Sequence, residues 1–507
     1  MESNKKKIFH TMASVSGLVI LSKILGFVKQ IVTANAFGAT IHTDIITLSE
    51  GLISNLDYLL VQALSTAFIP TYIYAKASDR KESDKFVSNT IILFLLLSFI
   101  ISCVVYIGAP VVSHILAPSY NEFDSIRLAR YIRFFAPALM LIVELAIFNA
   151  LLKANEVFIP GEMIGLNQSI ILIILVFLVG EKLGADTLVL SFYIYAMFNL
   201  AFLIIQSRKK WHFTWGSVFT DSNVLKLLKM MGPLLLGFSM VFINQQIDKM
   251  IVSGLGEGTV TAMGYASVLS NFICTFVGSI CGVLFTYITA KIADGEDAAA
   301  AELAIESVSQ IGTILIPISI ITIVCSHDIV SIVFGRGKFN AFAIDNCSKA
   351  LIGYGCMFIP YVIRELYSRF QYAYGDSKKP MINSTIGIVF NIIFSIVLSK
   401  IIGVLGVTIA TSISVLVCAI LNVVTSKKRN NHIKMDKIVQ FFPRWIIGIF
   451  SCLIITCFGT KELTNMSSLI RFVLVSTCSL TVYFIITFPI IKPLIYGLLK
   501  KEKDNKL

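Results

Sequence analysis

Long apolar segments run almost the whole length of this chain, and they constrain its fold more than any other feature. Fourteen of them lie between Ile8 and Ile491. About 20 apolar residues in a helix cross the roughly 30 Å hydrocarbon core of a bilayer. Only 14% of the residues are charged and the mean hydropathy is +0.82, whereas soluble domains have about 25% charged residues. The sequence therefore predicts an all-α polytopic membrane protein.

The loops between these segments differ in charge. The expected spans are 8–37, 43–75, 87–112, 129–153, 160–180, 186–206, 224–254, 259–291, 305–334, 344–374, 380–401, 404–425, 439–459 and 468–491. Most of the net charge of +12 lies in alternate loops, for example at Arg208–Lys210 and Lys427–Arg429. The positive-inside rule places these loops and both termini in the cytoplasm. The charge then reflects topology and contact with anionic lipid heads, and we expect no nucleic-acid partner.

A weak internal repeat relates the two halves of the chain. Phe68–Lys76 ends the second span much as Leu284–Lys291 ends the eighth. Ala154–Pro160 opens the fifth span much as Tyr374–Pro380 opens the eleventh. Both matches are six spans apart, which predicts two six-helix pseudo-symmetric lobes followed by two further helices, and transporters often bind their substrate between such repeats. The expected domains are an N lobe, a C lobe, and the last two spans with a basic tail, at 1–220, 221–430 and 431–507.

The second span carries polar residues at steps of four and three. These residues are Thr43, Thr47, Glu50, Ser54 and Asp57. This spacing places them on one helical face. A polar face in a membrane helix contacts protein or water rather than lipid. It indicates either a hydrogen-bonded helix interface or the wall of a wet cavity, and the two carboxylates favour the cavity.

Two lysines interrupt the first apolar span. Lys23 and Lys29 are separated by about 120° around an ideal helix. A cation inside a membrane protein suits an anionic ligand such as a phosphate or diphosphate. The same lysines could instead pair with Glu50 or Asp57 as structure.

Two more clusters of polar residues lie in the second half. Asn244 and Asp248 are one turn apart in the seventh span, and Asn271 lies in the eighth. Their oxygens predict a site for a sodium ion or a proton, with interhelical hydrogen bonding as the alternative. In the tenth span, Glu365 and Arg369 are i, i+4 partners beside Arg364.

Signatures of nucleotide-driven or enzymatic chemistry are missing from the sequence. It contains no G-x-x-x-x-G-K-[ST], H-E-x-x-H or G-x-S-x-G motif. We expect a transporter that has no cofactor and hydrolyses no nucleotide. A Na⁺ or H⁺ gradient, the membrane potential or the substrate gradient then drives transport.

Several short blocks resemble one known family. They are Leu21–Gln30, Phe37–Ala39, Thr43–Asp44, Ala67–Pro70, Met231–Leu234, Val333–Phe339, Arg364–Phe370 and Gly375–Pro380. Together they look like the signature of MurJ/MviN proteins, the lipid II flippases of the MOP (multidrug/oligosaccharidyl-lipid/polysaccharide) exporter superfamily. The resemblance covers nearly the whole chain.

The resemblance implies a function as well as a fold. It implies two MATE-like lobes around a central cationic cavity in the bacterial cytoplasmic membrane. It implies alternating access that carries lipid II, an undecaprenyl-diphosphate-linked glycan, to the outer leaflet, with membrane lipids and the peptidoglycan-synthesis machinery as partners. The family's first-helix serine and two arginines match Ser22, Lys23 and Lys29, and its acidic residue after the first loop matches Asp44.

Some positions depart from the family pattern. Leu56 or Asp57 stands where a second-helix arginine is found, and Val268 where an eighth-helix arginine is found. Arg364 and Arg369 are candidates to compensate for the lost charge. Other functions remain open: a flippase for teichoic acid, capsule or O-antigen-type units, a MATE-type drug or cation antiporter, a membrane glycosyltransferase, or a scaffold.

Overall fold

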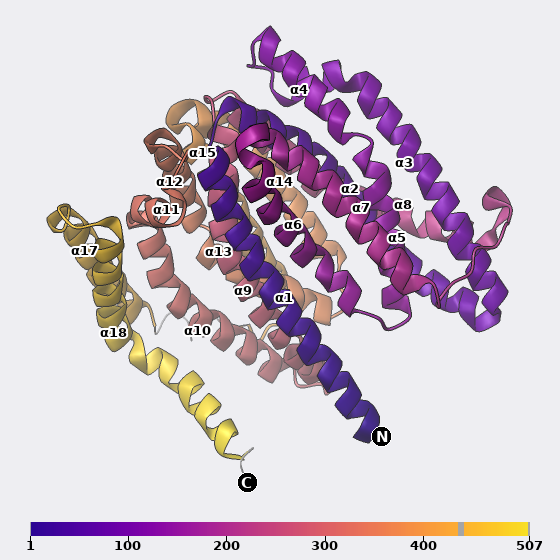
Figure 1. The fold of residues 1–507 in the computed structure, drawn as a ribbon. Helices are drawn as coiled ribbons and strands as arrows, with labels where there is room; N and C mark the ends of the chain where they lie inside the picture. Colours follow the sequence, from indigo (N-terminus) through magenta and orange to yellow (C-terminus); the bar gives the residue numbers. More distant parts are fainter. Residues whose placement is uncertain (1, 434–440, 505–507) are drawn as a thin grey trace. The chain divides into compact units, whose positions relative to one another are not determined.

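The computed structural model describes residues 2–433 and 441–504, with side chains for 17–56, 58–235, 239, 240, 242–433 and 441–490. The described residues form helices joined by short loops, and none of them lies in a strand (Figure 1). The prediction of an all-α polytopic chain is confirmed.

The helices fall into two compact units. Unit 1 comprises residues 1–261 and 336–340, and unit 2 comprises residues 262–335 and 341–507. Unit 1 contains α1 (Glu2–Phe37), α2 (Ile41–Ser78), α3 (Arg80–Leu116), α4 (Glu122–Phe135), α5 (Ala138–Ala154), α6 (Ile159–Leu183), η1 (Gly184–Asp186), α7 (Thr187–Ser207), η2 (Val218–Thr220) and α8 (Ser222–Ser253). Unit 2 contains most of α9 (Thr259–Ala293), then α10 (Asp297–Val324), α11 (Ser326–Phe334), α12 (Ala341–Gly355), α13 (Phe358–Ala373), α14 (Lys378–Ile402), α15 (Val404–Arg429), α17 (Phe442–Glu462) and α18 (Ser468–Asp504).

Each expected span coincides with one helix or with two consecutive helices. Eleven helical stretches among the described residues are long and apolar enough to cross a membrane, and one of them, Ile159–Ser207, holds both α6 and α7. The helices α8 and α13 interrupt their apolar sequence with several polar and charged residues. The expected number of about fourteen spans agrees with this arrangement.

The boundary between the units follows packing rather than the repeat. The helix α8, which the repeat assigns to the second half, packs against α2 and α3 and belongs to unit 1. The division between the compact units therefore falls at Thr261. The repeat-based domains, 1–220, 221–430 and 431–507, describe a different property of the chain and remain a prediction.

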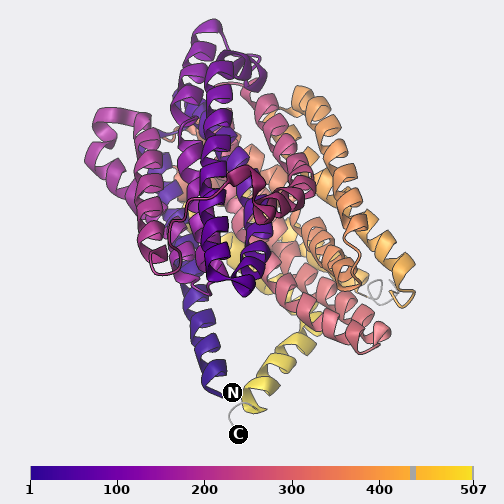
Figure 2. The same cartoon turned by 90° about the vertical axis from the view of Figure 1, so that its right-hand side faces the viewer.

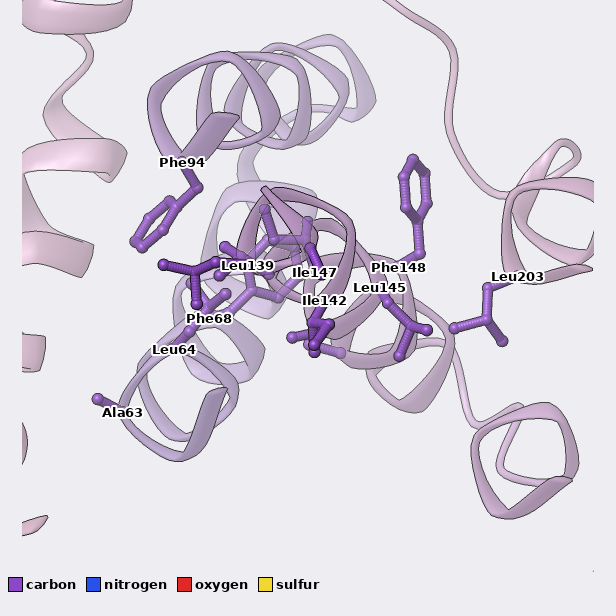
Figure 3. Close-up of a cluster of buried hydrophobic side chains, with 14 of the residues drawn as sticks. Ala63, Leu64, Phe68, Phe94, Leu139, Ile142, Leu145, Ile147, Phe148 and Leu203 are labelled. Atoms are coloured by element: carbon purple, nitrogen blue, oxygen red, sulfur yellow. The ribbon is translucent and has the colours of Figure 1, made fainter. Parts of the chain in front are cut away.

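The core of unit 1 surrounds α5. Leu139 and Ile147 on this helix are fully buried and belong to one hydrophobic cluster with residues of α2, α3 and α7, including Phe68 and Leu203 (Figure 3). Lipid is as apolar as these side chains, so close van der Waals packing rather than exclusion of water holds such helices together. On the outside of the helices, Ile107 and Phe177 are each 76% exposed, as expected for side chains that contact hydrocarbon.

The backbone repeats certain features in both units. Residues 136–137 interrupt the helix between α4 and α5, and residues 356–357 interrupt it between α12 and α13. Gly184 ends α6 with φ 58° and ψ −140°, and Gly403 ends α14 with φ 61° and ψ −137°. Only glycine adopts this backbone region without strain. The same turns at matching places support the internal repeat.

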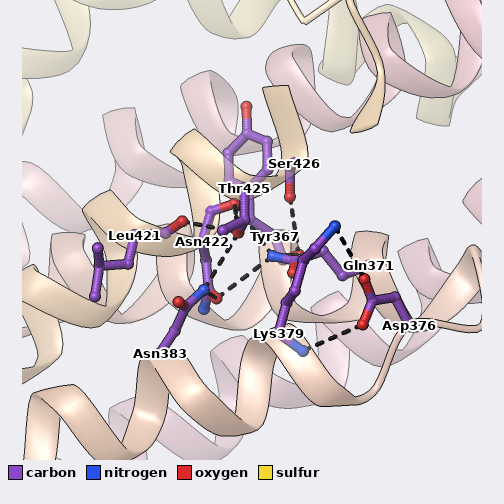
Figure 4. Close-up of polar contacts among 9 residues, drawn as sticks. All are labelled: Tyr367, Gln371, Asp376, Lys379, Asn383, Leu421, Asn422, Thr425 and Ser426. Carbon is purple, nitrogen blue, oxygen red and sulfur yellow. Dashed lines mark hydrogen bonds and ion pairs between the residues drawn. The ribbon is translucent and has the colours of Figure 1, made fainter. Parts of the chain in front are cut away.

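The helix pairs that follow these turns also match. In unit 1, α6 packs on α7, and Asn167 Nδ2 donates to Asn199 Oδ1 at 2.9 Å. In unit 2, α14 packs on α15, and Asn383 Nδ2 donates to Asn422 Oδ1 at 2.7 Å. The unit 2 pair belongs to a larger network that reaches Gln371 on α13 (Figure 4). The helices of each pair follow one another in the chain and are joined by the short turns at Gly184 and Gly403, and Figures 1 and 2 show the fold from two sides.

Candidate functional site

Three charged side chains of unit 1 form a polar cluster inside the apolar region. Glu50 on α2 interacts electrostatically with Lys29 on α1 and with Lys249 on α8. All three residues are half-buried. We call Lys29, Glu50 and Lys249 the cationic cluster, because two ammonium groups face one carboxylate.

A glycine makes room for this cluster. A Cβ atom built on Gly51 would lie only 2.1 Å from Lys249 Nζ, so the ammonium group rests directly on the backbone of α2 beside Glu50. Gln246, one turn before Lys249, donates to the carbonyl oxygen of Gly51 at 3.5 Å. Tight packing of α8 on α2 therefore positions the second cation.

Lys249 was not among the site residues predicted from the sequence. Its partner Glu50 is far away in sequence, and the spacing within each span gives no sign of the contact. The glycine directly after Glu50 was the available signal, because a missing side chain on a polar helix face permits close approach of a neighbour.

The N-terminal part of the polar face of α2 contacts the first turn of α9. Thr43 and Thr47 lie 3.3 and 3.5 Å from the hydroxyl of Thr261. Asp44 is fully buried, and its Oδ1 accepts a hydrogen bond from the backbone N–H of Thr261 at 2.7 Å. A carboxylate at a helix N-terminus satisfies amide groups that have no partner within the helix. Asp44 thus caps α9, and its role toward a substrate stays a prediction.

Three loops meet beside this cap within unit 1. The backbone N–H of Lys338 donates to the carbonyl oxygen of Asn35 at 3.0 Å. A Cβ on Gly38 would lie 2.3 Å from the carbonyl oxygen of Lys338, and a Cβ on Gly258 would lie 2.4 Å from that of Ala39. Both glycines have positive φ, 68° and 76°. The contacts tie the turn between α1 and α2 to residues 336–340 and to the start of α9.

The remaining residues predicted on α1 and α2 lie outside the cationic cluster. Lys23 is exposed, and Ser22 Oγ lies 2.8 Å from where Gly165 of α6 would place a Cβ, in the α1–α6 interface. Ser54 is half-buried on α2. The side chain of Asp57 lies outside the described residues. Of the two first-helix lysines, the structure brings only Lys29 to Glu50.

Unit 2 contains a separate charged group on α13. Arg369 Nη2 lies 2.7 Å from Glu365 Oε1 and Arg364 Nη2 lies 3.6 Å from Glu365 Oε2. The Arg364 guanidinium also stacks over the ring of Tyr361, 4.9 Å from its centroid. The expected i, i+4 pair is confirmed. All three charged side chains are partly exposed, so two guanidinium groups remain accessible around one carboxylate.

The three residues predicted to hold an ion are divided between the units. Asn244 and Asp248 are half-buried on α8 in unit 1, and Asn271 is exposed on α9 in unit 2. Among the described residues, no three His, Cys, Asp or Glu side chains are arranged to hold a metal ion. The ion site remains a prediction.

Comparison with known proteins identifies the family. The family model for the lipid II flippase MurJ matches residues 33–483. A probable lipid II flippase MurJ of Rickettsia prowazekii is 23% identical over 413 residues, which cover 80% of this chain and 81% of the relative. One from Borreliella burgdorferi is 24% identical over 448 residues, 87% of each chain.

Solved structures show the same fold. A lipid II flippase MurJ in an inward closed conformation superposes with a TM-score of 0.80 at 22% identity, covering 95% of this chain and all of the other. An inward-facing multidrug transporter of the MATE family in the MOP superfamily gives 0.65 at 15% identity, covering 81% and 95%. The fold is therefore that of MurJ and MATE transporters. Because the family model spans most of the sequence, the chain belongs to the MurJ family of lipid II flippases.

Proposed function

We propose that this chain moves lipid II from the inner to the outer leaflet of the bacterial cytoplasmic membrane. The family and the names of its relatives support this substrate. The polar head of a lipid-linked glycan cannot cross hydrocarbon unaided, because its unpaired polar groups would lose their hydration. A protein with polar faces inside the bilayer offers the head a hydrated route, while the prenyl tail stays in lipid.

The cationic cluster is the observation that carries this proposal. Lys29 and Lys249 outnumber Glu50, so the cationic cluster contains more basic than acidic groups where α1, α2 and α8 meet. A diphosphate is an anion, as the carboxylate of Glu50 is, and it can therefore bind to the same two ammonium groups in place of that carboxylate. Lysine binds phosphate as a compact charge with three donors and does not require the bidentate geometry of arginine.

Arg364 and Arg369 form a second basic group, in unit 2, and belong to the proposed substrate-binding residues. Only Glu365 pairs with them among the described residues, so their remaining donors can contact phosphate or sugar oxygens. The residues Ser22, Lys23, Asp44, Ser54 and Asp57 complete the proposed substrate-binding set, as the family resemblance and the polar face of α2 suggest.

The proposed mechanism is alternating access without nucleotide hydrolysis. A Na⁺ or H⁺ gradient or the membrane potential supplies the energy, with Asn244, Asp248 and Asn271 as the proposed ion site. Both termini are cytoplasmic in this proposal, in agreement with the positions of the basic loops. Delivery of lipid II outside the cell brings the protein near the enzymes of peptidoglycan synthesis.

The experiment is to supply this chain to bacteria depleted of their own flippase and to measure lipid II exposed on the outer leaflet. The variants are wild type, Lys249→Ala, Lys249→Arg and, as a control, Lys182→Ala, which removes an exposed lysine at the end of α6. We expect exposure to recover with wild type and Lys182→Ala, to fall about tenfold or more with Lys249→Ala, and to recover partly with Lys249→Arg.

The other outcomes separate the alternatives. Full exposure with Lys249→Ala at equal membrane abundance would contradict the role of the cationic cluster and favour a scaffold role. No recovery with well-expressed wild type would reject lipid II as substrate. The same assay with a teichoic-acid or capsule precursor would then test the alternative glycans.

A further inference from the structure

A lone carboxyl group lies in the core of unit 1. Glu144 is in the middle of α5 and only 6% exposed. Neither of its side-chain oxygens has a hydrogen-bond partner among the described residues. A buried carboxyl inside a membrane helix is rare, and it marks a functional position by default.

No charged group among the described residues compensates for this carboxyl. The helices that pack against α5 are α2, α3, α4, α6 and α7. The charged residues described on these helices include Asp44, Glu50, Asp84, Arg133 and Glu162, while α7 has none. None of these groups interacts electrostatically with Glu144. The other charged residue of α5, Lys153, pairs with Glu162 at 3.5 Å.

The favoured protonation state of Glu144 follows from its burial and from the lack of a cation beside it among the described residues. An ionised carboxylate far from water and without donors is much less stable than the neutral acid. This environment favours the neutral acid of Glu144. Neither oxygen of that acid has a hydrogen-bond partner among the described residues, so a conformation in which the group meets water or a polar side chain would complete its hydrogen bonds.

Nearby helices have unused hydrogen-bonding capacity as well. Asn149 Oδ1 on α5 and Asn199 Nδ2 on α7 are buried without partners among the described residues, and these two helices pack on each other. Unit 1 therefore holds several buried polar atoms whose hydrogen bonds are incomplete in this conformation.

We propose that Glu144 is a proton-binding site inside unit 1, occupied in this conformation, and that it links the transport cycle to protons. In the other state the O–H bond breaks, the electron pair stays on the carboxylate, and water takes the proton. The coupling rests on the proposed flippase function, whereas the occupied proton site does not.

The first test is spectroscopic and uses the full chain in lipid vesicles. We expect the infrared spectrum of wild type at neutral pH to contain the carbonyl band of a neutral carboxylic acid. The spectrum of wild type minus that of Glu144→Gln, which has nearly the same shape, should contain that band, and Glu144→Asp should shift it. The control Glu162→Gln removes a partly exposed, ion-paired carboxylate and should leave the band unchanged. Absence of the band from wild type, or from the difference between wild type and Glu144→Gln, would overturn the proton site.

The second test measures lipid II translocation in the same vesicles with and without a pH gradient. Wild type should respond to the gradient several-fold and Glu144→Gln should not respond. An unchanged response in Glu144→Gln would overturn the coupling. If no variant moves lipid II while the infrared band behaves as expected, the proposed function fails and the proton site stands.

Discussion

The helices α5 and α13 occupy the same place in the two units and carry opposite chemistry. Each begins just after the helix interruption that the units share, at residues 136–137 and 356–357. Two turns further on, α5 has Glu144 and α13 has Arg364. Glu144 is buried and alone, whereas Arg364 is partly exposed and lies near Glu365 and Tyr361. The internal repeat gives α5 and α13 the same backbone arrangement. The helices packed around each of them determine which side chain is tolerated at the matching position.

Packing explains the difference. The helix α5 is enclosed by α2, α3 and α7 and is buried along most of its length. The helix α13 packs on α10 and α15, and it keeps one side with charged residues partly open. A charged side chain on the open side of α13 can be hydrated. The same side chain on the enclosed helix α5 would lose its hydration. Four experiments test or refine this comparison.

The largest effect is expected from exchanging the two residues. Glu144→Arg places a permanent charge in an apolar core and should cost about 3 kcal/mol or more, so little folded protein should accumulate. Arg364→Glu should cost about 1 kcal/mol, because the site is partly exposed and the change replaces a long ion pair with Glu365 and a contact with Tyr361 by a screened repulsion. Membrane abundance and the Tm in detergent measure both. Equal losses would show that α13 is as closed as α5.

The shared glycine turns should respond alike. Gly184→Ala and Gly403→Ala each place a side chain in a backbone region that only glycine adopts freely, and each should cost about 2 kcal/mol. Neither position has an atom within 4 Å of the added Cβ, so backbone strain alone acts. Gly312→Ala, in a helix with open space around it, is the control and should not destabilise the protein. A large difference in Tm between the first two variants would argue against equivalent turns.

The packing of Lys249 on α2 can be disturbed without removing a charge. Gly51→Ala puts a methyl group where the ammonium lies. The flexible lysine should move away while the helices remain folded, and lipid II exposure should fall about tenfold, or about 1.4 kcal/mol. Gly108→Ala, which meets no atom within 4 Å, should leave transport unchanged. Normal transport by Gly51→Ala would show that the position of Lys249 is unimportant.

The smallest effects concern the buried asparagines. Asn199 has one interhelical bond, to Asn167, whereas Asn422 accepts from Asn383 and donates to Ser368 at 2.8 Å. Bonds between membrane helices contribute roughly 0.6 kcal/mol each. Asn422→Ala should therefore cost about 1 kcal/mol and Asn199→Ala about 0.5 kcal/mol, measured as the free energy of unfolding in mixed micelles. A larger loss for Asn199→Ala would reverse the expected order.

The sequence by itself determined the class of the protein, the helices and the repeat. The class and the helices follow from the lengths of the apolar segments. A backbone inside lipid must satisfy its own hydrogen bonds, and so it becomes helical wherever the chain stays apolar. The pair formed by Glu365 and Arg369 was also predictable, since both residues lie on one helix.

Only the tertiary structure decided which charges meet. Lys249 reaches Glu50 because α8 packs on α2, and Asp44 caps α9 rather than standing free. Glu144 is isolated because three helices close around α5, although its sequence position resembles that of Arg364. Such contacts join residues far apart in the chain, and the spacing within one helix reports only which face a side chain occupies, not what lies opposite.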